Sequence, residues 1–366
     1  MSHVFFCTRF YDELKEEISS LTELRATTET NNLIVARPQI FCTMIDQKVL
    51  NHIMDVSSQC CPICGSTPTE FMDMTNFDTQ KFQPYNDGLD FGISPLHAWL
   101  NVFNHLLRLA DHKPIEQHRA CGHENKQMCK LRKQEIQRDL YQEFGIKVGI
   151  PNSNGAGNSN NGNCARRAFE NPREFARILD LDADLVSDLK AVLVCISSRY
   201  PINPLPFKRF CRSIQERYIE LYPWYPMSAT LHKVLEHSWE VARNFPVPTG
   251  LLTEEGLESK HKVHKKIRRV HCRKTSRKDA MHDLFYRSMD LSDPVLAHIA
   301  IERSSKYQRF HVIPEQARRF LILNEMEHIN EEIPGEFESE DDIHNAAFQA
   351  ALEGQFNIVQ DELDEN

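Results

Sequence analysis

Residues 231–278 read LHKVLEHSWEVARNFPVPTGLLTEEGLESKHKVHKKIRRVHCRKTSRK, and this stretch combines three kinds of chemistry. It begins with two histidines, His232 and His237, and continues into an acidic cluster that ends at Glu258. A run from Lys260 to Lys278 follows, with ten Lys/Arg and no acid. A carboxylate beside a dense positive surface is typical of a site that binds divalent metal and polyphosphate together. A solvent-exposed helix with many ion pairs explains the same charge pattern equally well.

The composition of the 366 residues is that of an ordinary globular chain. The hydrophobic fraction of 41% and the charged fraction of 26% are close to average, and the length predicts two or three domains. No stretch approaches about 18 uninterrupted apolar residues, so we expect no membrane span. Eleven Cys and 17 His at irregular spacing favour metal sites in a reducing, intracellular compartment over a secreted disulfide framework.

The net charge of −9 conceals two parts of opposite sign. Residues 325–366 contain fourteen Asp/Glu and no Lys/Arg, so residues 1–324 together carry a net charge of +5. A basic body with an acidic tail favours a nucleic-acid-binding protein whose tail is disordered or autoinhibitory. A tail that only improves solubility is the alternative interpretation.

Hydrophobic patterning predicts strands near the N-terminus and helices further along the chain. Residues 3–8 and 32–45 are rich in β-branched and aromatic side chains, which is typical of strands. Asp46 directly follows the second segment, where a carboxylate either lies at the rim of a sheet or simply belongs to a turn. Residues 93–110 and 127–144 have the apolar spacing of amphipathic helices.

Cys61 and Cys64 form a Cys-x-x-Cys-Gly half-site that is typical of zinc. Such a turn places two thiolates about one metal ion, and the following glycine permits the tight backbone. A tetrahedral site needs two further ligands, and the pair His232 and His237 is one choice. The other choice is the group of His and Cys residues that lies closer in the sequence: His118, Cys121, His123 and Cys129.

A polar segment rich in Gly and Asn, residues 151–163, predicts a loop that leads into a helix. Asn163, Arg166 and Arg167 lie at this junction. The backbone N–H groups at the start of a helix and a pair of arginines are suited to a phosphate backbone. A flexible linker before a surface helix is the alternative.

Several short motifs, taken in order, resemble the Transib-type DDE transposases, the family that includes the catalytic subunit of the V(D)J recombinase. The motifs are MIDQK (44–48), CPIC (61–64), ISPLHAW (93–99), NGNCARR (161–167), LHKVLEH (231–237) and LLTEEGLES (251–259). The basic run that follows also matches. Together the motifs cover residues 40–280, and the resemblance is weak after about residue 300.

The resemblance implies a mixed α/β architecture, in which a truncated RNase H-like catalytic domain is interrupted by a large, mainly helical zinc-binding insertion. Residues 1–59 would form part of the RNase H-like domain, and residues 60–245 the insertion. Residues 246–324 would carry the catalytic-type Glu, the basic run and C-terminal helices. We expect the acidic tail, residues 325–366, to be disordered.

The resemblance also implies roles for individual residues. Asp46 and Glu258 correspond to catalytic acids that hold Mg²⁺ or Mn²⁺, which activate and position the oxygens of a phosphoryl displacement. Structural Zn²⁺ would be bound by Cys61, Cys64, His232 and His237. Contacts with DNA are expected from the loop–helix junction and the basic run: Asn163, Arg166, Arg167, Lys260, Lys262, Lys265, Lys266, Arg268, Arg269, Arg273 and Lys274.

The first catalytic acid of the family has no counterpart here, because the only Asp before Asp46 is Asp12, which we interpret as a helix cap. We therefore expect the chain to begin inside the catalytic domain and to be inactive, although the lineage cleaves DNA and transfers strands. The alternative is a non-catalytic, zinc-stabilised protein that binds DNA or a protein partner. We further expect a nuclear location, a possible homodimer and no contact with membranes.

Overall fold

The computed structural model describes residues 24–27, 33–36, 47, 50–51, 54–77, 79–85, 88–151, 159–253, 255–290, 310–323 and 332–334. The chain divides into two compact units. Unit 1 comprises Met1–Thr253 together with Pro314–Leu323, and unit 2 comprises Glu254–Ile313 and Asn324–Asn366. No helix of the described residues is long and apolar enough to cross a membrane.

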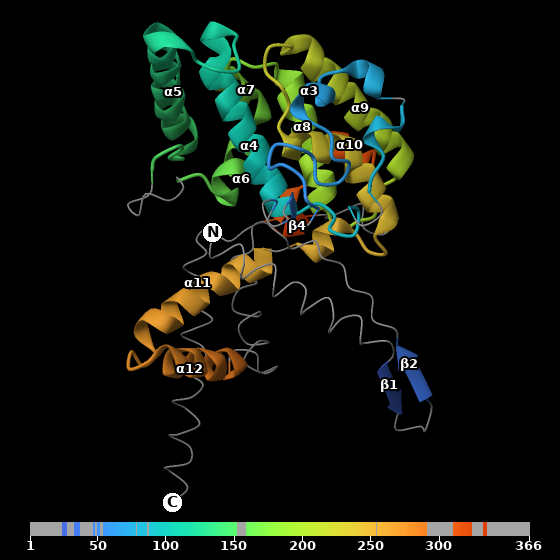
Figure 1. The fold of residues 1–366 in the computed structure, drawn as a ribbon, viewed down its shortest axis with the longest axis vertical. Helices are drawn as coiled ribbons and strands as arrows, with labels where there is room; N and C mark the ends of the chain where they lie inside the picture. The colour runs from blue at the N-terminus through green and yellow to red at the C-terminus, as the bar shows by residue number, and fades with distance from the viewer. Residues whose placement is uncertain are drawn as a thin grey trace, which may run out of the picture. The chain divides into compact units, whose positions relative to one another are not determined.

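Unit 1 is built almost entirely from helices (Figure 1). Helix α4 packs against α5, α6, α8 and α10, and α9 packs against α8 and α10. Helix α8 is buried on nearly all sides, as expected for a helix that is apolar all round. The helices are α3 (Pro68–Phe71), α4 (Pro95–His112), α5 (Gly122–Phe144), α6 (Gly162–Glu170), α7 (Pro172–Leu179), α8 (Ala183–Ser197), α9 (Pro204–Leu221), α10 (Ala229–Asn244) and α14 (Glu315–Arg318). Short 3-10 turns are η1 (Met74–Asn76), η2 (Gln80–Phe82), η3 (Lys113–Ile115) and η4 (Thr249–Leu252).

Capping side chains fix where these helices begin. Ser94 accepts a hydrogen bond from the His97 N–H at the start of α4, and Pro95 occupies a first-turn position where no backbone donor is needed. Asn161 caps α6 and Ser228 caps α10 in the same way. The helices predicted over residues 93–110 and 127–144 are confirmed as α4 and α5, although α5 begins earlier, at Gly122, without a side-chain cap from Cys121.

Residues 314–323 return to unit 1 and pack against the start of α9. The Asn203 N–H donates to the Phe320 carbonyl (2.7 Å), and the Ile322 N–H donates to the Pro201 carbonyl (2.8 Å). The Phe320 ring stacks on Phe210 with a centroid separation of 4.6 Å. This segment therefore belongs to the core of unit 1 although it follows unit 2 in the sequence.

The expected mixed α/β fold with an RNase H-like sheet is wrong. The strands in the described residues form two short antiparallel pairs, β1 (Leu24–Thr27) with β2 (Leu33–Ala36), and β3 (Phe310–Val312) with β4 (Glu332–Pro334). The described structure is predominantly helical, because its long segments bury apolar residues with helical spacing. Residues 3–8 and most of residues 32–45, from which a sheet was inferred, lie outside the described residues.

Unit 2 contains a pair of helices, α11 (Glu255–Val270) and α12 (Arg277–Asp290). The hydroxyl of Ser288 and Nε2 of His264 lie 3.2 Å apart and link the two helices. Ser276 accepts a hydrogen bond from the Asp279 N–H and so marks the start of α12. Ile267 is buried, whereas α12 has no fully buried residue.

Candidate metal centre and basic cleft

The cysteine half of the predicted zinc site is a tight turn that precedes α3. The Gly65 N–H donates to the Cys61 carbonyl (2.7 Å), and the Cys61 N–H donates to the Ser66 carbonyl (2.9 Å). Gly65 has φ = +74°, and a Cβ at this position would collide with Tyr85. A larger residue would strain the backbone and displace Tyr85, so glycine is required here.

The histidine half lies on α10, where both His232 and His237 are completely buried. Cys61, Cys64 and these two histidines each offer one ligand atom, and all four atoms lie within 4.8 Å of one another. Nε2 of His232 is 3.5 Å from Sγ of Cys64. These four residues could therefore hold a metal ion such as zinc, and two thiolates with two imidazoles are a common zinc ligand set.

The hydrogen bonding of His237 also fits a metal ligand. Its Nδ1 lies 2.8 Å from Oε2 of Glu240, one turn further along α10. Its Nε2 is buried without a hydrogen-bond partner. A histidine that binds metal through one nitrogen normally donates its other N–H to a carboxylate or carbonyl. Sequence reasoning missed Glu240, although its position three residues after His237 on a helix could have indicated it.

Aromatic rings enclose the four-residue cluster. The Phe71 ring stacks on His232 with a centroid separation of 4.0 Å and an angle of 12°, and Phe82 meets the same imidazole edge-on at 4.8 Å. Both phenylalanines are buried. This apolar shell keeps water away and fixes the orientation of the ring, so the cluster is suited to a structural metal rather than to one that binds a substrate.

The titration of the cluster is unusual because thiols and imidazoles share one buried space. Burial raises the pKa of Cys61 well above its usual value, whereas the hydrogen bond from Cys61 holds the pKa of Cys64 far below its usual range. Burial lowers the pKa of His237, but its interactions with the nearby Cys64 sulfur and with the Glu240 carboxylate outweigh burial and raise the value to about 9. In the metal-free protein, bound protons therefore neutralise the negative charge of the cysteine sulfurs, which a metal cation would otherwise neutralise.

The alternative group of zinc ligands is not assembled. Cys121 and His123 are exposed at the start of α5, and Cys129 is buried further along the same helix. Among the described residues, the cluster of Cys61, Cys64, His232 and His237 is the one that brings metal-ligand atoms together.

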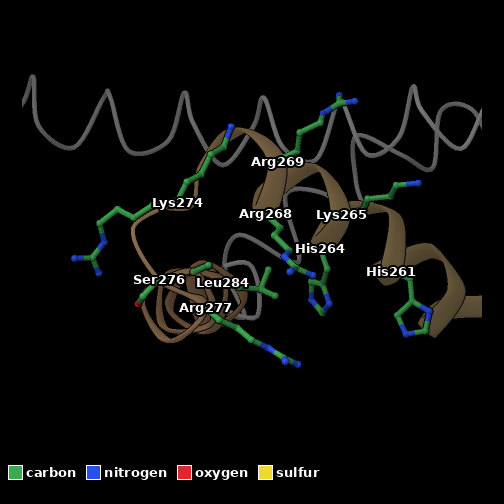
Figure 2. Close-up of a pocket in the computed structure, with 11 residues that line it drawn as sticks. His261, His264, Lys265, Arg268, Arg269, Lys274, Ser276, Arg277 and Leu284 are labelled. Atoms are coloured by element: carbon green, nitrogen blue, oxygen red, sulfur yellow. The ribbon is translucent and has the colours of Figure 1, made fainter. Parts of the chain in front are cut away.

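Unit 2 contains a basic cleft between α11 and α12 with a volume of about 770 Å³ (Figure 2). Figure 2 shows His264 and Arg268 pointing from α11 toward α12. Among the side chains that line the cleft there is no Asp or Glu. The cleft is lined by His261, His264, Lys265, Arg268, Arg269, Arg273, Lys274, Ser276, Arg277, Ala280 and Leu284.

Five residues predicted to contact DNA line this cleft: Lys265, Arg268, Arg269, Arg273 and Lys274. Lys266 lies on α11 but does not line the cleft, and Lys260 and Lys262 are described only as backbone of α11. Arg277, which also lines the cleft, was not singled out from the sequence. Its membership in the same basic run was the available signal.

Arg273 differs from the other cations because it is committed to an ion pair. The Arg273 guanidinium donates hydrogen bonds of 2.8–3.2 Å to both carboxylate oxygens of Asp283, and the backbone N–H of Arg273 donates to the same carboxylate. These hydrogen bonds lower the pKa of Asp283 to about 2. Arg273 thus ties the connection between the helices to α12, and its charge is balanced.

The other predicted DNA contacts, Asn163, Arg166 and Arg167, belong to α6 in unit 1. Arg167 donates from Nη2 to the Phe144 carbonyl (2.7 Å) at the end of α5. The Arg166 guanidinium lies over the Trp99 ring, 5.8 Å from its centroid. Both arginines therefore contact neighbouring helices of unit 1.

The predicted catalytic pair falls on parts of the chain about which the structure says little. Asp46 lies outside the described residues, and Glu258 is described only as backbone of α11. The expectation that these two carboxylates share Mg²⁺ or Mn²⁺ stays a prediction. The comparisons with known proteins do not assign the chain either, since no protein-family model and no curated protein matches it.

Proposed function

We propose that this chain is a DNA-binding protein, in which zinc stabilises the helical unit 1 and the basic cleft of unit 2 binds phosphates. The observation that carries this proposal is the cleft itself. Six Lys/Arg line it, and of these only Arg273 is paired with an acid among the described residues. Like charges held this close repel each other, and an anionic backbone relieves that repulsion while counterions are released.

The chemistry of the ligands supports zinc as the metal of the cluster. Two cysteines and two histidines are soft or borderline ligands, which favour zinc over the oxygen-seeking Mg²⁺ and Ca²⁺. Complete burial of Cys61, His232 and His237 leaves no room for a substrate. A metal bound there contributes its binding energy to folding.

The order of the motifs that resemble Transib-type transposases favours DNA over other polyanions as the ligand. The proposed activity requires only charge and shape, both of which are provided by described residues of α11, α12 and the connection between them.

The proposal is tested by the salt dependence of binding to a fluorescently labelled DNA duplex. Each lost phosphate contact should reduce the slope of log K against log [salt] by about 0.9. The variant Lys265→Gln/Arg268→Gln/Arg269→Gln removes three exposed charges of the cleft, so we expect its slope to fall by up to about 3. Lys126→Gln/Lys130→Gln, on the exposed surface of α5, is the control and should leave the slope unchanged. Equal slopes for the parent and the cleft variant would refute the proposal.

A further inference from the structure

The ligand of the cleft can be narrowed further, on the basis of the proposed DNA-binding function. We infer that the cleft accepts an unpaired DNA strand, whose phosphates lie along the cations while its bases stack on an apolar stripe of α12. This α12 stripe consists of Met281, Phe285, Tyr286 and Met289.

The α12 stripe is unusually exposed for its chemistry. Met281 is 52% exposed, Phe285 61%, Tyr286 55% and Met289 58%. Single exposed apolar side chains are normal, but a contiguous group of them on one helix marks an interaction site. The stripe therefore needs a ligand or partner that offers apolar surface.

The stripe borders the cleft on the surface of α12. Met281, Phe285 and Met289 follow one another at four-residue intervals, so they share one face of the helix. Ala280 and Leu284 line the cleft, and Met281 and Phe285 directly follow them, about 100° further round the helix. A ligand seated in the cleft can thus reach the stripe without crossing another helix face.

Asp279 and Asp283 lie away from the row of Met281, Phe285 and Met289, whereas Asp290, the third acid of α12, lies one turn after Tyr286. Asp279 and Asp283 precede Met281 and Phe285 by two residues, which places them about 200° away round the helix. Asp283 is bound by Arg273, and Asp279 accepts hydrogen bonds from residues at the start of the helix. Between Leu284 in the cleft and the row of Met281, Phe285 and Met289, the surface of α12 therefore carries no acid.

A cationic groove beside exposed aromatic rings is the arrangement that binds single strands. The cations follow the phosphates, and the rings stack on base faces, which a duplex hides inside its own stack. The Phe285 ring meets Tyr286 edge-on, with 5.8 Å between centroids and an angle of 79°, and Tyr286 also meets His282 at 4.5 Å. Phe285, which is 61% exposed, is therefore the ring of this pair on which a base can stack.

Charge makes a second copy of the chain a poor occupant of the stripe. Pairing two α12 stripes would bring two basic clefts next to each other, and like charges across an interface are unfavourable. A DNA strand instead supplies both the anionic backbone and the flat apolar surface that the two neighbouring regions require.

The test measures the affinity of the full-length, zinc-loaded protein for labelled oligo(dT) and for a duplex of the same length. Phe285→Ala should weaken oligo(dT) binding about tenfold, the typical effect of losing one stacked base. Phe285→Tyr keeps a ring and should bind like the parent. Tyr141→Ala removes an exposed aromatic residue of unit 1 (54% exposed) and is the matched control. Duplex binding, which uses phosphates alone, should be the same for all four proteins.

The outcomes separate this inference from the proposed function. If the parent binds the duplex but not oligo(dT), or if Phe285→Ala binds oligo(dT) as well as the parent does, the inference is wrong while DNA binding by the cleft stands. If the parent binds neither DNA, both fail. Because Phe285 is largely exposed, the alanine variant should fold, and the tyrosine variant provides a second measurement if it does not.

Discussion

Zinc should stabilise this chain by an amount that rises with the logarithm of free zinc, and the slope can be worked out from the site. The cluster of Cys61, Cys64, His232 and His237 has room for one ion, since its four ligand atoms lie within 4.8 Å of one another. For one ion bound only by the folded state, each tenfold rise in free zinc adds about 1.4 kcal/mol to the free energy of unfolding. For a unit of this size, that is a rise in Tm of roughly 3–6 °C per decade.

The measurement is chemical unfolding followed by circular dichroism in zinc buffers that span several decades of free zinc. The variant Cys61→Ser/His237→Ala, which removes one ligand from each half of the site, should show a slope near zero. Cys129→Ser makes the same sulfur-to-oxygen change at a buried cysteine outside the cluster, so it should keep the parent slope. A double variant that retains the parent slope would show that zinc binds elsewhere.

Three further predictions concern buried groups of unit 1. Zinc affinity should increase between pH 6 and about 9, because the pKa of His237 in the metal-free protein is about 9 and zinc must displace that proton. Competition with a chromogenic chelator measures the zinc affinity at each pH, and an affinity that does not change with pH would contradict the prediction. Burial lowers the pKa of His105 to about 3, so the unfolded state takes up its proton below about pH 6.5 while the folded state does not. Stability should therefore fall by about 1.4 kcal/mol per pH unit below 6.5, and His105→Gln should remove this part of the pH dependence of unfolding; an unchanged dependence would contradict it. Phe71→Ala, at a fully buried ring that stacks on His232, should lower the free energy of unfolding by roughly 3–5 kcal/mol, and a loss below about 1 kcal/mol would mean that the ring does not support the site.

The metal site shows which part of a tertiary arrangement a sequence can predict. The Cys61–Cys64 turn is local, so spacing and the following glycine were sufficient to identify it. The histidines lie more than 160 residues away, and spacing alone could not choose between them and the group around Cys121. That choice depends on which helix packs against the cysteine turn, and this is decided by the core as a whole rather than by the ligands.

The fold class was predicted wrongly for a related reason. Helical segments such as residues 93–110 carry their own periodicity and capping signals, so they were predicted correctly from the sequence. The sheet was inferred from short β-branched segments and from a resemblance between motifs. Strand pairing joins segments that lie apart in the sequence, so a short apolar run alone does not show whether it pairs with another strand. Only β1 with β2 and β3 with β4 are paired within the described residues.

The sequence also does not distinguish the individual cations of the basic run, residues 260–278, and this matters for the choice of variants. From the sequence, all ten cations after Glu258 are equivalent, yet the structure gives them different partners. Arg273 is held by Asp283, ten residues away, while Arg268 faces α12 across the cleft. Arg167 of unit 1 binds a carbonyl at the end of α5 in a similar internal role. Removing Arg273 should therefore disturb the connection between the two helices, whereas removing Arg268 should change phosphate binding alone. Charge variants must therefore be chosen by the contacts of each cation and not by how many cations are removed.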